Sequence, residues 1–121
     1  MSEARLQKSI ITYLRLRYPR VLFCASLGGQ FQPYQSQRQK AKDTGYQPGF
    51  PDLFIYESKS KYHGLAIEIK TEKGRPTKLQ KQWIDNLNSK GYCARICKGW
   101  NEIIQTIDSY LNEQVIDDKE S

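Results

Sequence analysis

The hydrophobic positions nearest the N-terminus predict an amphipathic helix over residues 2–18. Apolar side chains recur there at the spacing of one helical face: Leu6, Ile10, Tyr13 and Leu14. Pro19 follows the last turn and cannot continue the helix. Glu3 falls on the same face as the apolar positions, which is unusual for a carboxylate, although the helix dipole also favours an acid in the first turn.

Four short apolar runs, each bounded by turn residues, predict four strands. They cover residues 21–25, 52–56, 64–71 and 92–97. The first two strands are separated by a long polar stretch, residues 26–48. Connections of that length are uncommon unless they are functional or partly helical. We therefore expect a short helical turn near residues 35–43 and a loop that can meet a ligand.

Two further helices are predicted in the C-terminal half. One runs from Thr77 to about Lys90 and ends at Gly91. Its apolar stripe consists of Leu79, Trp83 and Leu87. Trp83 is therefore expected in the core rather than as a base-stacking platform. Asn101 is the expected N-cap of the last helix. The apolar positions of that helix are Trp100, Ile103, Ile104, Ile107 and Leu111.

The element order, α-β-β-β-α-β followed by a C-terminal helix, predicts an α/β fold. A central mixed four-stranded sheet flanked by helices on both faces is the natural arrangement. With 121 residues the chain has room for one core. We expect a single domain over residues 1–112 and an acidic tail over residues 113–121.

The net charge of +6 is unevenly distributed along the chain. Residues 102–121 carry six acids and one lysine, a net −5, which leaves +11 for residues 1–101. This imbalance favours a polyanionic partner, of which nucleic acid is the commonest, although lysines also simply keep a protein soluble. The basic residues expected at a nucleic-acid surface are Arg38, Lys40, Lys42, Lys73 and Arg75.

Cysteine usage and hydropathy weigh against several other classes of protein. Cys24, Cys93 and Cys97 lie among apolar or β-forming neighbours, which indicates buried thiols rather than a disulfide framework or a zinc site. No run of 18 apolar residues occurs, so we expect no transmembrane helix and no membrane partner. The N-terminus lacks the apolar centre of a signal peptide, so a cytoplasmic location is expected.

Two acids and a lysine are predicted to converge on the strand over residues 64–71. The two-residue period of a strand places Glu68 and Lys70 on one face. Such a pair is common on solvent-facing strands, but this strand should be central and covered by helices. Asp52 opens the neighbouring strand, and Glu3 projects from a helix that should pack on the sheet.

Carboxylates that converge beside one lysine repel each other unless a cation joins them. Hard oxygen ligands hold Mg²⁺ or Mn²⁺. Such an ion lowers the pKa of a bound water, and a lysine stabilises charge that develops at phosphorus. Asp52, Glu68 and Lys70 are thus a minimal set for phosphodiester hydrolysis. Gln80 has two interpretations: it closes a capping box with Thr77, or its amide faces the same site.

Taken in order, the motifs resemble the VRR-NUC branch of the PD-(D/E)-x-K nucleases over about residues 2–97. The resemblance is carried by Glu3 with Leu6-Gln7, Lys42, Gly45, Gly49-Phe50-Pro51-Asp52, Glu68-Ile69-Lys70, Gln80 within Thr77 to Trp83, and Gly91. It implies a restriction-endonuclease-like core. Lys70 would be the catalytic lysine and Gln80 an accessory catalytic residue. The ligands of Mg²⁺ or Mn²⁺ would be Asp52, Glu68, the carbonyl of Ile69 and, through water, Glu3.

The resemblance also implies a substrate and an assembly. Stand-alone bacterial and phage members of this branch look like homodimers that resolve four-way (Holliday) junctions, which would make this chain a DNA-repair endonuclease in a bacterial or phage-infected cell. A nuclease that prefers flaps, nicks or ends is the main alternative. A third hypothesis is a non-catalytic nucleic-acid-binding module. The intact acids disfavour it, because a protein that only binds nucleic acid gains nothing from acids beside a polyanion.

Overall fold

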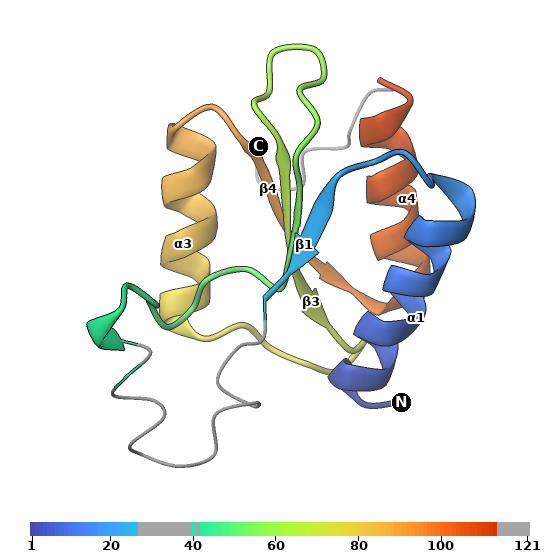
Figure 1. Ribbon diagram of the computed structural model, residues 1–121. Coiled ribbons are helices and arrows are strands. Elements are labelled where there is room, and N and C mark those ends of the chain that lie inside the picture. Colours follow the sequence, from blue (N-terminus) through green and yellow to red (C-terminus); the bar gives the residue numbers. More distant parts are fainter. Residues whose placement is uncertain (27–39, 41, 114–121) are drawn as a thin grey trace.

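The computed structural model describes residues 1–26, 40 and 42–113 of the chain (Figure 1). The bounds of its elements are α1 Glu3–Arg17, β1 Phe23–Ala25, β2 Leu53–Ile55, β3 Leu65–Lys70, α3 Lys78–Ser89, β4 Cys93–Lys98 and α4 Gly99–Leu111. This order of helices and strands is the one that the sequence predicts, so the α/β fold is confirmed.

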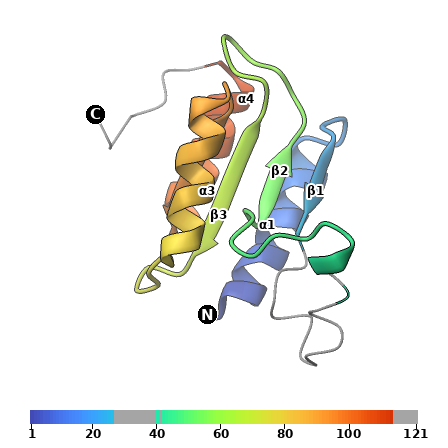
Figure 2. The ribbon, with the colours of Figure 1, turned by 90° about the vertical axis from the view of Figure 1, so that its left-hand side faces the viewer.

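The four strands form one mixed sheet in the order β1-β2-β3-β4. Figure 2 shows the first three side by side. The first two pairs are antiparallel, whereas β3 and β4 are parallel and are joined through α3, because parallel strands need a crossover. β3 is therefore central, as predicted. β2 pairs only with Leu65–Ile67, so the last three residues of β3 extend beyond the start of β2.

Helices cover both faces of the sheet, α1 and α4 on one face and α3 on the other (Figure 1). Leu65, Ile67 and Ile69 of β3 pack in the larger core cluster with residues of α1 and α4. Ala66 packs with Ile84 of α3 on the opposite face. The two-residue alternation predicted for this strand is confirmed.

The first helix forms where its apolar periodicity predicts. The hydroxyl of Ser2, its N-cap, accepts a hydrogen bond of 3.2 Å from the Arg5 N–H. Leu6, Ile10 and Leu14 are buried.

A carboxylate on α4 holds α1 in place. Asp108 accepts hydrogen bonds from the hydroxyl of Tyr13 at 2.8 Å and from that of Tyr18 at 2.6 Å. Burial, with the hydrogen bond to Asp108, raises the pKa of Tyr18 to about 12. Both tyrosines therefore remain neutral donors over the whole physiological range of pH.

Replacing Asp108 by alanine is expected to lower the free energy of unfolding by about 2–3 kcal/mol, because two hydroxyls lose a charged acceptor. Urea denaturation followed by circular dichroism measures this change. Asp108→Asn keeps an acceptor and should cost less, and Asp85→Asn on the exposed side of α3 should cost less than about 0.5 kcal/mol. An Asp108→Ala protein as stable as the wild type would remove Asp108 from this role.

The last helix begins three residues earlier than expected, so the prediction of Asn101 as its N-cap is wrong. Lys98, the last residue of β4, takes the N-cap position without a side-chain hydrogen bond. Gly99 has a φ of +82°, and a Cβ there would lie 2.8 Å from the side chain of Glu72. Glycine thus lets the chain turn from strand to helix without a connecting loop.

Two apolar residues of α3 lie outside the core positions predicted for them. Leu79 is 52% exposed, and the buried residue of this helix is Ile84. Trp83 is only partly buried and packs edge-to-face on Phe50, with ring centroids 5.2 Å apart. Both residues face the segment that precedes β2, because α3 begins beside it.

Two of the three cysteines are buried as predicted, Cys93 and Cys97, and no disulfide links the described residues. The prediction is wrong for Cys24, which is exposed because β1 is a short strand at the edge of the sheet.

The polar connection and the acidic tail are described only in part. Lys40, Lys42 and Asp43 are helical, and the rest of the turn expected near residues 35–43 lies outside the described residues. The same holds for residues 114–121 of the tail. Of the helices that the structure describes, none is both long and apolar enough to cross a membrane.

Candidate functional site

Asp52 stands where the pairing of β2 with β3 ends. Pro51 precedes it and has no N–H to donate, so the strand ladder stops at Leu53. The carboxylate of Asp52 continues the ladder instead, because its Oδ2 accepts the N–H of Ile69 at 2.8 Å. The N–H and C=O of a strand residue point to the same neighbour. The carbonyl of Ile69 is therefore directed to the same edge as this carboxylate.

Glu68 is a buried acid, 1% exposed. Burial raises its pKa to about 9; the charge and hydrogen bond of Asp52 add to this rise, while Lys70 opposes it. Among the described residues, no hydrogen-bond partner meets its Oε1 atom. A buried, unpaired carboxylate oxygen is costly. This oxygen therefore needs either a proton or a cation, which the described residues do not provide.

Lys70 joins the strand to the first helix. Its Nζ lies 3.6 Å from Oε2 of Glu68 and 3.7 Å from Oε2 of Glu3. The lysine side chain is 7% exposed, whereas that of Glu3 is 41% exposed. Four charged side chains from α1, from the start of β2 and from β3 thus converge, as the sequence predicts.

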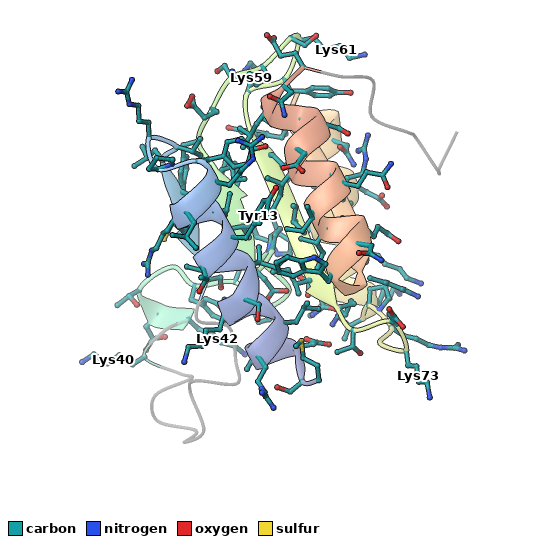
Figure 3. All side chains as sticks on the ribbon, turned by 90° about the vertical axis from the view of Figure 1, so that its right-hand side faces the viewer. Tyr13, Lys40, Lys42, Lys59, Lys61 and Lys73 are labelled. Carbon is teal, nitrogen blue, oxygen red and sulfur yellow. The ribbon has the colours of Figure 1, made fainter. Side chains whose placement is uncertain are left out.

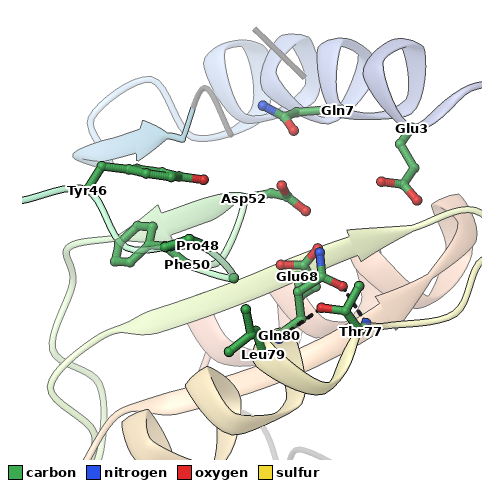
Figure 4. Close-up of a pocket in the computed structure, with 11 residues that line it drawn as sticks. Glu3, Gln7, Tyr46, Pro48, Phe50, Asp52, Glu68, Thr77, Leu79 and Gln80 are labelled. Atoms are coloured by element: carbon green, nitrogen blue, oxygen red, sulfur yellow. Dashed lines mark hydrogen bonds between the residues drawn. The ribbon is translucent and has the colours of Figure 1, made fainter. Parts of the chain in front are cut away.

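These carboxylates open onto a pocket of about 440 Å³ (Figure 4). Residues of α1, of the segment before β2, of β3 and of α3 form its walls. They are Glu3, Gln7, Tyr46, Pro48, Gly49, Phe50, Asp52, Glu68, Thr77, Leu79 and Gln80. One side of the pocket is acidic and the other is apolar, so a phosphate could bind on the acidic side only with a cation between it and the carboxylates.

Gln80 takes part in the capping box and also lines the pocket. Its N–H donates to Oγ1 of Thr77 at 3.2 Å, and its Oε1 accepts the N–H of Thr77 at 2.9 Å, which completes the capping box. The same side chain lines the pocket. The capping box uses the side-chain oxygen as an acceptor, so the amide nitrogen, which is the donor of this side chain, is left for a ligand.

Sequence reasoning gave no role to two polar residues of the pocket. Gln7 follows Glu3 by four residues, so its place on the same helical face could have been found from the spacing alone. Tyr46 extends its hydroxyl toward Asp52 (Figure 4). Burial raises the pKa of Tyr46, and the charges of Asp52 and Glu68 raise it further. No periodicity in its polar segment points to this position.

The basic residues predicted to meet nucleic acid lie at the same end of the molecule as the pocket. Lys40 and Lys42 precede β2 and Lys73 follows β3, whereas Lys59 and Lys61 lie at the opposite end (Figure 3). All three are exposed, as is Arg75. Arg38 lies outside the described residues.

The oxygen atoms at the mouth of the pocket fit a hard divalent cation. Within the described residues, no group of three or more His, Cys, Asp or Glu side chains is close enough to hold a metal. The available set is instead two neighbouring carboxylates, Asp52 and Glu68, with the carbonyl of Ile69. The unpaired Oε1 of Glu68 is the atom that such an ion would satisfy.

Comparison with known proteins agrees with this site. The VRR-NUC domain profile matches residues 4–101. A solved structure described as a VRR_NUC domain protein is 28% identical, covering 97% of this chain and 93% of the other, with a TM-score of 0.78. No curated protein matches the chain. VRR-NUC domains are nuclease domains that typically use divalent metals and act on DNA. The chain therefore belongs to the VRR-NUC family of nucleases.

Proposed function

We propose that this protein is a Mg²⁺- or Mn²⁺-dependent DNA endonuclease that hydrolyses phosphodiester bonds. The observation that carries the proposal is the buried Glu68 beside Asp52. Its carboxylate contacts a buried lysine, and one of its oxygens has no hydrogen-bond partner in the described part of the chain. Neither a structural salt bridge nor a DNA-binding surface calls for a buried acid next to a partly buried one at a pocket. A metal-dependent hydrolase does.

Asp52, Glu68 and the carbonyl of Ile69 would hold the metal, with Glu3 contributing through water. When bound, the ion polarises the phosphate and lowers the pKa of the attacking water. The hydrogen bond from the Ile69 N–H fixes the carboxylate of Asp52, so this ligand is oriented before any ion arrives.

Lys70 supplies the positive charge of the site. Its ammonium group orients the attacking water and stabilises the charge that develops on the phosphate oxygens. Glu3 and Glu68 contact Nζ from two sides and thus fix the position of the lysine. Gln80 is an accessory residue, through its amide nitrogen.

The substrate that we propose is a four-way DNA junction, cut by a homodimer. Two symmetric cuts require two active sites related by a two-fold axis, which a dimer of this chain provides. The exposed Lys40, Lys42, Lys73 and Arg75 would contact the phosphate backbones. A nuclease with a broader preference for flaps, nicks or ends uses the same active site and differs only in the shape of DNA that it admits.

A cleavage panel tests the proposal. Four-way, flap, nicked, linear duplex and single-stranded DNA are incubated with the protein in Mg²⁺, Mn²⁺ or EDTA, and light scattering gives the mass in solution. We expect junctions to be cut into two nicked duplexes in either metal, no cutting in EDTA, and the mass of a dimer. If flaps are cut faster than junctions, a flap replaces the junction as the proposed substrate. If no DNA is cut, the nuclease proposal is overturned.

A further inference from the structure

A second cavity, of about 520 Å³, lies beside the proposed active site. The first two turns of α1 contribute to both cavities, since Glu3 and Gln7 line the first while Leu6 lines the second. The walls of the second cavity come from the segment that follows β3, from the segment that follows β4 and from the N-terminal end of the chain. They are Met1, Leu6, Thr71, Glu72, Lys73, Gly99 and Trp100.

Trp100 presents an aromatic ring to this cavity. It is 40% exposed, although it belongs to the apolar stripe from which the last helix was predicted. Tyr13 meets the indole edge-on, with ring centroids 5.8 Å apart and an angle of 84° between the ring planes. A half-exposed indole that is held by a neighbouring ring is the type of side chain on which nucleobases stack.

The charges around the cavity favour a base over a phosphate next to Trp100. The side chain of Glu72 lies against Gly99, the first residue of α4. Its carboxylate therefore lies near the positive end of the helix, where its charge disfavours a phosphate. Lys73 is exposed at the rim, where it can meet the phosphate that adjoins a bound base.

The cavity lies within reach of a DNA strand in the active site. Thr71 follows Lys70 directly and is three residues beyond Glu68. At the rise of a β-strand, Thr71 in the near wall of the cavity is about 10 Å from Glu68. This distance corresponds to about three nucleotides of a stacked DNA strand.

We propose that this cavity is a base-binding subsite, in which Trp100 stacks on an unpaired nucleobase about three nucleotides from the scissile phosphate. Lys73 contacts the adjoining phosphate. The base is unpaired because both faces of a base within a duplex are covered by its neighbours, so a duplex leaves no face for the indole. This inference rests on the proposed nuclease function. It favours flaps and forks, which carry a single-stranded segment next to the cut, over the four-way junction, whose bases are paired.

Binding of a forked duplex with single-stranded thymidine arms tests the subsite. All proteins carry Glu68→Gln and are measured in EDTA by fluorescence anisotropy, so that no DNA is cut. Trp100→Ala is expected to weaken binding by about 5- to 100-fold, and Trp100→Phe by less than about threefold. Leu22→Ala, at an apolar residue that is 67% exposed outside both cavities, is the matched control and should bind as the parent protein does.

A fork with abasic arms separates base stacking from phosphate contact. On that fork Trp100→Ala should bind like the parent protein, because no base remains to stack. Equal losses on both forks, equal losses for alanine and phenylalanine, or no loss at all would each overturn the proposal.

Intrinsic fluorescence gives a readout that does not depend on how Trp100→Ala folds. The chain has two tryptophans, so Trp83→Phe leaves Trp100 as the only emitter. Thymidine arms should quench this emission and abasic arms should not; unchanged emission at saturating fork would overturn the subsite. If the arms quench the emission but the protein with Glu68 cuts no DNA in metal, the subsite stands and the nuclease function is overturned. If that protein cuts DNA and the arms do not quench, the nuclease function stands and the subsite is overturned.

Discussion

Replacing Glu68 by glutamine is expected to reduce DNA cleavage by about 10³-fold or more, because the site loses a charged metal ligand. Lys70→Met should cause a loss of the same order, since it removes the only positive charge in contact with Glu68 among the described residues. Neither variant should weaken DNA binding by more than a few-fold. Single-turnover cleavage in Mg²⁺ measures the loss of catalysis, and binding in EDTA measures any loss of affinity for DNA.

Matched variants set the scale of these losses. Lys61→Met removes an exposed lysine at the opposite end of the molecule and should cut DNA at the wild-type rate (Figure 3). Glu3→Gln should lose only about 10- to 100-fold, because this acid would act on the metal only through water and contacts Lys70 from a more exposed position. If Glu68→Gln cut within tenfold of the wild type, Glu68 would not be a ligand of the catalytic metal.

The metal-free protein is expected to become more stable when Glu68 is replaced by glutamine. Burial and Asp52 raise the pKa of Glu68 to about 9 in the folded chain, far above the value near 4.5 of an unfolded glutamate. Between these two values the folded state holds a proton that the unfolded state has lost. The free energy of unfolding therefore falls as pH rises from 4.5 toward 9. Glutamine carries no such proton and removes this dependence.

Thermal unfolding in EDTA measures the effect. The two proteins should have similar melting temperatures near pH 5. As pH rises, the melting temperature of the variant should exceed that of the wild type, by at least about 4 °C at pH 8. Groups that titrate equally in both proteins cancel in the difference. A difference that does not change with pH, or that favours the wild type at pH 8, would contradict a raised Glu68 pKa.

Metal addition should reverse this order of stability. A divalent ion binds the ionised carboxylate, so its binding releases a proton and its affinity for the wild type rises with pH up to about 9. Mg²⁺ should therefore stabilise the wild type more at pH 8 than at pH 6, and stabilise the glutamine variant little at either pH. Calorimetry in two buffers with different ionisation enthalpies counts the released proton.

Much of the site was predictable because its spacing follows local backbone geometry. Glu68 and Lys70 share a face of β3 through the two-residue period of a strand, and Leu65, Ile67 and Ile69 fill the other face for the same reason. The stripe of α1 likewise follows from its helical period.

The remaining features of the site depend on contacts between distant segments, which no local pattern encodes. Tyr46 reaches the pocket only because the segment before β2 folds back beside α3, as the hydrogen bond from Trp83 Nε1 to the Pro48 carbonyl shows. Leu79 and Trp100 occupy apolar positions of their helices and still face solvent or a cavity, because the sheet ends before it covers them.

The sequence alone was enough to predict which elements form and which residues share a face, because the periods of helices and strands are properties of the backbone. It also determined that acids and a lysine would meet on the central strand. Two features came from tertiary packing instead: Asp52 accepts the N–H of Ile69 just before β2 begins, and one buried oxygen of Glu68 has no partner among the described residues. The physical reason is strand register and burial, which are set by the packing of the whole sheet between its helices.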